Sequence, residues 1–181
     1  LAAEADEVIL VVGFTHEDEG EYVILSRDEM LANAKAGKPS GKASIGGDRA
    51  DLSLNEVDET LIQTLAGSNP NFVVVYVGGS AIDLSTWEDE VPAILFAWYA
   101  GMEGGNALAN VLYGEVSPSG KLPYSIAKAQ EDYPEFMPFT TQIKYGYYHG
   151  YTLFDKEEKA VAYPFGFDLS YANFSYDSLR W

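Results

Sequence analysis

The chain of 181 residues contains no cysteine, so it forms neither disulfide bonds nor zinc sites built on thiolates. This absence does not locate the protein, because secreted proteins can also lack cysteine. Basic residues are scarce as well: 11 Lys and Arg stand against 28 Asp and Glu, for a net charge of −17. Nucleic acids and anionic membranes favour basic surfaces, so we expect neither as a partner. The charge fits a neutral substrate or a salt-tolerant protein.

The sequence also lacks the patterns of several function classes. No apolar run approaches the roughly 20 residues of a membrane-spanning helix. Residues 101–106 (GMEGGN) follow a predicted strand and open a predicted helix, but they match neither the dinucleotide fingerprint nor the P-loop. The Gly-x-Ser-x-Gly motif of serine hydrolases is missing. His16 with Glu17 and Glu19 is a weak metal signal, so we predict no metal and no cofactor.

No signal peptide is visible at the start, yet the chain begins at Leu1 rather than at a methionine. The compartment in which the protein works therefore stays open.

An apolar run with an acidic segment directly after it is the most informative feature. Residues 8–12 (VILVV) are closed by Gly13 and followed by residues 14–21 (FTHEDEGE), which hold four carboxylates and a histidine. Such a run predicts a strand buried on both faces of a parallel sheet, and ligands bind just past the carboxyl ends of such strands. Repulsion among carboxylates raises the pKa of one member, as general acid/base catalysis requires. A solvated acidic loop is the alternative interpretation.

The order of apolar runs and helix signals predicts an α/β fold. We expect strands over residues 8–13, 72–77, 93–97 and, at a sheet edge because of its proline, 122–126, and helices over 55–65 and 104–113. In the first helix Val57, Leu61 and Leu65 should face the core. The resulting fold class is a three-layer sandwich with a mostly parallel sheet flanked by helices, followed by an irregular Tyr/Pro/Gly-rich C-terminal stretch. Three or four strands are few for such a sheet, so upstream elements are expected outside this chain.

Two further features admit both a functional and a structural interpretation. Arg49 either braces the acidic segment or contacts a ligand. Residues 145–151 (YGYYHGY) could form an aromatic wall of a sugar site, because tyrosine offers an apolar face and a hydroxyl group. We expect most of these rings to be packed and one or two to face a ligand.

Short motifs spread over nearly the whole chain add up to a resemblance. They are, in order, Glu19-Gly20-Glu21-Tyr22, Gly47-Asp48-Arg49, Asn69-Pro70-Asn71 before a Val-rich strand, Trp87, Ala93-Ile94-Leu95, residues 99–107 (YAGMEGGNA), Leu112-Tyr113-Gly114, residues 117–123 (SPSGKLP) and residues 163–167 (YPFGF). No single motif is decisive, but their order and spacing are highly specific. The chain resembles the second, α/β-sandwich domain of family 3 glycoside hydrolases of the β-glucosidase type.

The resemblance implies a retaining mechanism. A carboxylate nucleophile attacks the anomeric carbon, and a second carboxyl group protonates the leaving oxygen and then activates water. In the family the nucleophile is an aspartate of a preceding (β/α)₈-type barrel domain, and the acid/base is a glutamate in a Gly-Glu-Gly-aromatic loop of the second domain. That glutamate corresponds to Glu21, with Glu19 as the fallback, and Tyr22 and Arg49 are the candidate substrate-binding residues. The implied substrate is a β-linked glucoside or oligosaccharide, and the implied partner is the barrel domain, or a separate chain that carries it.

The chain departs from the family pattern at several positions. The second glycine of the acid/base loop is missing, and an insert of about 20 residues separates Tyr22 from Gly47, so the assignment of Glu21 can shift by one or two positions. Asp168 stands where the family usually shows glycine. The nucleophile is expected on a barrel that these residues do not include.

The resemblance also predicts the domain organisation. Residues 1–165 are expected to form the acid/base domain, and residues 166–181 a linker toward a fibronectin-like third domain. A non-catalytic α/β module that binds a sugar or a protein partner is the alternative. A phosphorylase, in which phosphate replaces water, agrees less well with the net charge of −17.

Overall fold

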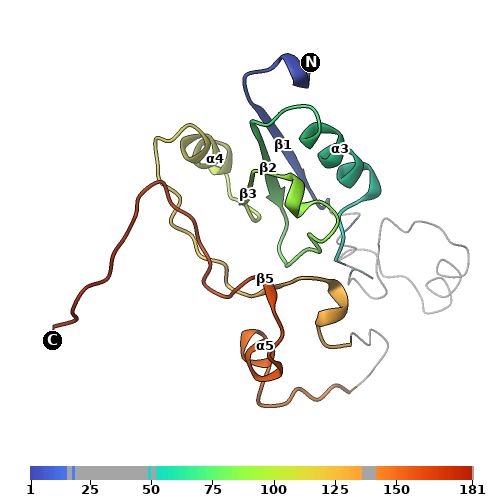
Figure 1. Cartoon of the computed structure of the whole chain (residues 1–181), viewed down its shortest axis with the longest axis vertical. Helices are drawn as coiled ribbons and strands as arrows, with labels where there is room; N and C mark the ends of the chain where they lie inside the picture. Colours follow the sequence, from blue (N-terminus) through green and yellow to red (C-terminus); the bar gives the residue numbers. More distant parts are fainter. Residues whose placement is uncertain (16–17, 19–48, 50–51, 136–141, 181) are drawn as a thin grey trace, which may run out of the picture.

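The computed structural model describes residues 1–15, 18, 49, 52–135 and 142–180. Its centre is a three-stranded parallel sheet of order β1-β2-β3. The strands are β1 (Val8–Gly13), β2 (Phe72–Val77) and β3 (Ala93–Phe96). In Figure 1 the sheet lies between α3 (Glu56–Ala66) and α4 (Gly104–Leu112). The predicted α/β fold with a parallel sheet and flanking helices is confirmed, and the described residues form no closed barrel.

Helix α3 begins after Asn55, as predicted, but a different side of it faces the core. Ile62 is fully buried, and Leu65 packs against the same core. Val57 and Leu61, which the periodicity placed inward, are 77% and 40% exposed, so that part of the prediction is wrong. Apolar residues stand at two adjacent positions, 61 and 62, and a spacing rule alone cannot tell which of the two meets the sheet.

One face of the sheet forms the core together with α3. Val12 of β1 and Val74 and Tyr76 of β2 are at most 5% exposed on this face. The segment between β2 and β3 adds fully buried side chains, namely Ile82, Leu84 and Trp87. Burial of each such side chain stabilises the fold by about 1.5–3 kcal/mol before the entropy of ordering is subtracted.

Strand β1 is buried on one face only, so the prediction of a strand buried on both faces is wrong. Leu10 and Val12 point toward the core, whereas Ile9 and Val11 are 40% and 56% exposed on the opposite face. Within the described ranges β1 is an edge strand that pairs with β2 alone. A run of five apolar residues locates a strand, but it does not reveal what covers each face.

The C-terminal half forms a smaller unit. It contains an antiparallel pair of short strands, β4 (Ile126–Ala127) and β5 (Val161–Tyr163), and a helix, α5 (Tyr151–Glu157), which the sequence patterns did not predict. Single turns of 3₁₀ helix occur at η1 (Ala2–Glu4), η3 (Glu88–Glu90) and η4 (Gln130–Asp132). In Figure 1 the small sheet lies beyond the carboxyl ends of the parallel strands.

The predicted edge strand over residues 122–126 is wrong except at its last residue. Ile126 pairs with β5 in the separate small sheet and not with the parallel one. Leu122 instead exchanges backbone hydrogen bonds with the segment after β5: its N–H donates to Phe167 and its C=O accepts from Gly166. Pro123 has no N–H to donate, so a continuous ladder through it is not possible. Among the helices that the structure describes, none has the length and apolar character needed to cross a membrane.

Candidate active site at the carboxyl end of the parallel sheet

The acidic segment leaves the sheet at a close approach between two strands. Gly13 ends β1 with φ of +150°, and a Cβ atom there would lie 1.9 Å from the backbone oxygen of Val77. The N–H of Phe14 donates to that same oxygen at 3.1 Å. Only glycine fits such an approach, so Gly13 sets the direction in which the chain leaves the strand. The segment thereby starts at the sheet end where α/β proteins bind ligands.

Asp18 anchors this segment after the strand. Its Oδ2 accepts hydrogen bonds from the backbone N–H and the hydroxyl of Thr15, both at 2.8 Å, and its Oδ1 accepts one from Nδ2 of Asn55 at 3.2 Å. Burial alone would raise the pKa of Asp18, but these hydrogen bonds and the positive charge of Arg49 together lower it. Asp18 is therefore a buried, ionised anchor, which does not suit a proton donor.

Among the described carboxyl groups, the one whose pKa is raised is Asp58, which lies outside the acidic segment. Burial raises the pKa of Asp58, in the first turn of α3, and the negative charge of Asp18 raises it further. A hydrogen bond from the backbone N–H of Gly13 opposes both effects. The sequence analysis missed Asp58, because its only sequence signal is its place at the start of a helix. Its bond to Gly13 joins α3 to the end of β1.

Arg49 braces the base of the segment. Its guanidinium carbon lies 3.9 Å from the ring centroid of Phe14, and its Nη2 donates to the hydroxyl of Ser80 in the turn after β2. Cation–π contacts of this kind stabilise by about 0.5–2 kcal/mol. With its charge also acting on Asp18, these contacts agree with the bracing interpretation. A ligand contact by Arg49 stays a prediction.

The other predicted site residues lie outside the described residues. These are Glu21, its fallback Glu19 and Tyr22, together with His16 and Glu17 of the weak metal signal. Of the four candidate catalytic and substrate-binding residues, the structure therefore describes Arg49 alone. Within the described ranges no group of three His, Asp or Glu side chains is arranged to hold a metal ion.

A row of aromatic rings runs from the site toward the small sheet, and the sequence analysis missed it. Ring centroids are 5.0 Å apart for Tyr76 and Phe96, 6.0 Å for Phe96 and Trp98, and 5.7 Å for Trp98 and Tyr124. Trp98 follows β3 with φ of +56°, a left-handed conformation that is rare for tryptophan. Backbone strain of this kind clusters at functional sites. No sequence pattern reveals this conformation.

Tyr124, at the far end of this row, is electrostatically linked to the site. Burial raises the pKa of its hydroxyl, Tyr133 adds to the rise, and the charge of Arg49 opposes it. The hydroxyl oxygen is buried and has no hydrogen-bond partner among the described residues. The side chains past the carboxyl ends of β1, β2 and β3 therefore form one connected group.

The tyrosine-rich segment is mostly exposed. Tyr145 and Tyr147 are 68% and 88% exposed, and Tyr148 and Tyr151 are 44% and 45% exposed. Contacts among rings are local, with Tyr147 against Tyr148 and Tyr151 stacked on Phe165. The expectation that most of these rings are packed is therefore wrong for the structure of this chain.

Comparison with known proteins shows what this arrangement is similar to. Residues 1–171 match the sequence model of the "Glycosyl hydrolase family 3 C-terminal domain". A "Beta-glucosidase" of Kluyveromyces marxianus is 34% identical over 182 residues, which cover 98% of this chain and 19% of that protein. An "Exo-alpha-(1->6)-L-arabinopyranosidase" of Bifidobacterium longum is 37% identical over 161 residues, covering 86% of this chain and 21% of that protein.

The solved structures agree. The family 3 β-glucosidase of Neurospora crassa superposes with a TM-score of 0.80 at 30% identity, covering 99% of this chain and 21% of that one. The chain thus spans about a fifth of the length of the relatives that it matches.

Proposed function

The chain belongs to glycosyl hydrolase family 3, because residues 1–171 match the C-terminal domain of that family. On that premise we propose that it supplies the general acid/base of a retaining β-glycosidase. The proposed residue is Glu21, with Glu19 as the fallback. Its carboxylic acid gives a proton to the glycosidic oxygen while an aspartate of a barrel domain bonds to the anomeric carbon, so the bond between that carbon and the glycosidic oxygen breaks and the aglycone leaves as an alcohol. The resulting carboxylate then takes a proton from water, and the hydroxide breaks the covalent bond and releases the sugar.

The observation that carries this proposal is the anchored start of the acidic segment. Gly13, Asp18 and Arg49 hold it at the carboxyl end of the parallel sheet. Asp18 is ionised, and burial together with the charge of Asp18 raises the pKa of the neighbouring Asp58. A general acid at Glu21 or Glu19, which lie outside the described residues, needs such a rise in its own pKa.

We propose a β-D-glucoside as the substrate, because the Kluyveromyces marxianus relative is a β-glucosidase. An α-L-arabinopyranoside is the second candidate, favoured by the 37% identity to the Bifidobacterium longum arabinopyranosidase. The two sugars differ in the hydroxymethyl group at C5 and in the orientation of the hydroxyl group at C4, so the residues around these two carbons decide between them. In the proposed enzyme those residues belong to the barrel domain.

The non-catalytic module is the weaker alternative. A free-standing domain covers the apolar faces of its sheet with its own residues. The face of β1 that carries Ile9 and Val11 is instead exposed. This exposure supports a domain that packs against further protein, as the half-site proposal requires.

The test is hydrolysis of aryl β-glucosides by the 181-residue chain alone and by the enzyme in which it is joined to its barrel. We expect no turnover by the chain alone. In the joined enzyme Glu21→Gln should lower kcat/KM by about 10²–10⁴-fold for a poor leaving group and far less for dinitrophenyl glucoside, whose phenolate leaves without protonation. For the dinitrophenyl glucoside kcat should still fall, because release of the sugar needs the base. Azide should restore turnover of the activated substrate, because it replaces the water that needs the base.

Glu7→Gln is the matched control, since Glu7 is an exposed carboxylate before β1. If Glu19→Gln, and not Glu21→Gln, shows these kinetic losses and the rescue by azide, Glu19 is the acid/base. Full activity of both variants would refute the proposal. Turnover by the chain alone would place the nucleophile within these 181 residues.

A further inference from the structure

Asn55 stands directly before α3, at the position where an asparagine side chain usually caps a helix. Its backbone is extended, with φ of −63° and ψ of 143°, and its carbonyl oxygen accepts a helical hydrogen bond from the N–H of Glu59 at 3.0 Å. The side-chain oxygen of an N-cap asparagine normally accepts a bond from an N–H of the first turn. In α3 no such side-chain bond forms. The side chain of Asn55 therefore serves a contact other than capping.

That contact is with Asp18 in the acidic segment. Nδ2 of Asn55 donates to Oδ1 of Asp18 at 3.2 Å, although the two residues are 37 positions apart in the chain. The bonds from Thr15 to Oδ2 of Asp18 act within the segment, whereas the bond from Asn55 joins the segment to a helix of the core. Hydrogen bonds to an ionised group are stronger than those between neutral groups. Asn55 thus ties a buried carboxylate to α3.

The first turn of α3 holds the segment at a second point. Asp58 lies three residues after Asn55, and it accepts a hydrogen bond from the backbone N–H of Gly13. Figure 1 shows the start of α3 at the end of the sheet where β1 terminates. One end of a single helix therefore contacts both the last residue of β1 and the carboxylate of Asp18 five residues later. Together the two contacts fix where the acidic segment begins and where it passes α3.

Neighbouring charges explain why residue 55 is asparagine. Aspartate caps helices as well as asparagine does, and its charge is favourable at a helix N-terminus. At this position, however, a carboxylate would have no hydrogen to donate and would lie against the ionised Asp18, with Asp58 close by. An amide supplies the donor without adding a charge. The residue type at position 55 therefore suits the contact with Asp18 better than it suits capping.

The candidate acid/base residues follow Asp18 closely in the chain. Glu19 is the next residue and Glu21 is the third after Asp18. Three residues of extended chain span at most about 11 Å, so a fixed Asp18 limits how far Glu21 can lie from α3. Catalysis is sensitive to such limits, because a misplacement of about 1 Å can cost about 10²-fold in rate.

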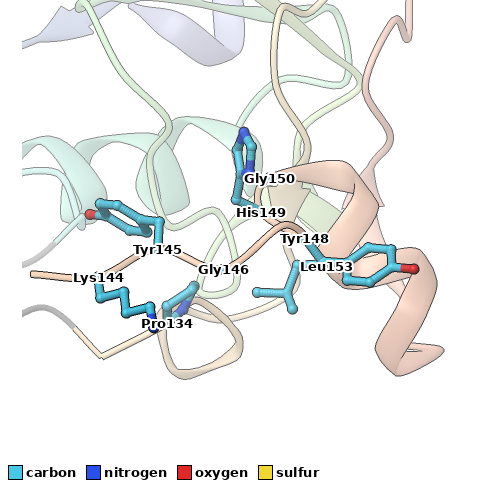
Figure 2. Close-up of a pocket in the computed structure, with 8 residues that line it drawn as sticks. All are labelled: Pro134, Lys144, Tyr145, Gly146, Tyr148, His149, Gly150 and Leu153. Atoms are coloured by element: carbon cyan, nitrogen blue, oxygen red, sulfur yellow. The ribbon is translucent and has the colours of Figure 1, made fainter.

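We propose that Asn55 is a positioning residue for the general acid/base, which it holds in place through Asp18. The identity of the acid/base rests on the proposed function, whereas the contact between Asn55 and Asp18 does not. The arrangement is confined to the sheet end. Figure 2 shows the open hollow before α5, whose lining comes from Pro134, Leu153 and residues of the segment 144–150 and includes none of these contacts. Substitution of Asn55 therefore leaves that lining unchanged.

The experiment compares two substitutions at position 55 in the enzyme in which this chain is joined to its barrel. Asn55→Asp keeps a good N-cap residue but puts a carboxylate against Asp18, so kcat/KM for an alkyl β-glucoside should fall by at least about tenfold. For dinitrophenyl glucoside kcat/KM should change by less than about threefold, because its phenolate leaves without protonation. Asn55→Ala removes the donor without adding a charge, so its loss should be smaller. A capping role alone would give the opposite order of the two variants and affect both substrates equally.

A reciprocal exchange tests the contact itself. When Asp18→Asn is added to Asn55→Asp, the amide at position 18 can accept from Thr15 and donate to the carboxylate at position 55. In this double variant kcat/KM for the alkyl glucoside should recover to within about threefold of wild type. Asn106→Asp is the matched control, because Nδ2 of Asn106 donates to Oε2 of Glu103 at 2.6 Å at the start of α4. The same repulsion there should leave the dependence on the leaving group unchanged.

The outcomes separate this inference from the proposed function. Wild-type kcat/KM of Asn55→Asp for both substrates, or no recovery in the double variant, would overturn the positioning role and leave the glycosidase role in place. Should Asn55→Asp lose its native NMR spectrum, Asn55→Ala is tested instead, and wild-type kcat/KM for the alkyl glucoside would overturn the proposal.

No hydrolysis by the joined wild-type enzyme would refute the glycosidase role itself. NMR of the 181-residue chain then decides whether Asn55 holds the segment. Asn55→Asp should shift the amide signals of residues 19–21, and the double variant should reverse the shifts. Unchanged signals would refute the hold of Asn55 on the segment as well.

Discussion

The parallel sheet with α3 and the C-terminal segment of residues 142–180 differ in how they use apolar residues. In the first, Ile62, Phe72 and Val74 are at most 1% exposed and belong to one core. In the second, Phe154 is the one large apolar side chain that is buried, while Tyr147, Tyr176 and Leu179 are more than 80% exposed. Rings are abundant in the second region, but they lie on its surface.

The difference shows that aromatic content does not by itself make a core. A helix on a sheet gives each apolar residue several neighbours, whereas a segment with one short strand and one short helix does not. Individual hydrogen bonds hold the second region instead, such as the one from Tyr171 to the carbonyl of Val111 at 2.7 Å. The exposed rings of this region are therefore available for contact with a sugar or with another protein surface.

The largest effect that we predict tests the core of the first region. Ile62→Ala should lower the free energy of unfolding by about 2–5 kcal/mol, because it leaves a cavity between α3 and the sheet. Leu61→Ala is the matched control on the same helix, and its 40% exposed side chain should cost less than about 1.5 kcal/mol. Urea unfolding measures both. Equal losses would contradict the orientation of α3.

The next effect tests whether the second region has a core of its own. Phe154 is 5% exposed and lies edge-on against Tyr133 at 5.7 Å. Phe154→Ala should cost about 2–3 kcal/mol, less than a phenylalanine in a full core, because its thin surroundings collapse more easily. Amide hydrogen exchange should speed up in α5 and stay unchanged in β2. Faster exchange in both would show that the two regions unfold as one unit.

A smaller effect tests the anchor of the acidic segment and its dependence on pH. The folded pKa of Asp18 lies below its unfolded value near 3.9, so ionised Asp18 stabilises the fold above that pH. This contribution is lost as the pH falls through the folded pKa. Asp18→Asn should therefore cost about 1.5–3 kcal/mol at pH 7, and the difference from wild type should shrink below pH 4.

Asp58→Asn is the control, because the pKa of Asp58 is shifted in the direction opposite to that of Asp18. The pKa of Asp58 is raised, so its contribution is present below the unfolded value and is lost as the pH rises through the folded pKa. The amide keeps an acceptor for the N–H of Gly13 and removes the unfavourable charge, so Asp58→Asn should not lose stability at neutral pH. Parallel pH profiles for the two variants, measured by thermal unfolding, would contradict the assigned pKa directions.

The smallest effect concerns a surface ion pair in the second region. Asp168 accepts a hydrogen bond from the ammonium of Lys121 at 2.5 Å, and the Lys121 side chain is 55% exposed. Asp168→Asn should cost less than about 1 kcal/mol, and the cost should vanish in molar salt. A larger, salt-independent loss would show that Asp168 does more than pair with Lys121.

Several elements could be predicted from the sequence for a clear physical reason. The strands of residues 72–77 and 93–97 are short apolar runs between turn signals, and the helix after Asn55 has a regular apolar spacing. Such patterns depend on neighbours in the chain. The failures concern neighbours in space: which side of α3 faces inward, what covers Ile9 and Val11, and where the segment around Pro123 finds its partners.

The candidate site divides in the same way. The place of the acidic segment after β1 could be predicted, and so could the possible bracing by Arg49. The bond from Asn55 to Asp18 and the raised pKa of Asp58 could not, because each depends on residues far away in sequence. The left-handed conformation of Trp98 has no signal in the sequence. Glu21, Glu19 and Tyr22 stay predictions from the family pattern.

The sequence by itself determined the family, the order of strands and helices, and the position of the acidic segment after the first strand. These are properties of residue types at given spacings, and a reader of the chain can count them. Only the tertiary structure decided which carboxyl group is held ionised and which rings form the row from Tyr76 to Tyr124. Burial, charge and free space arise when distant segments meet, so no local pattern specifies them.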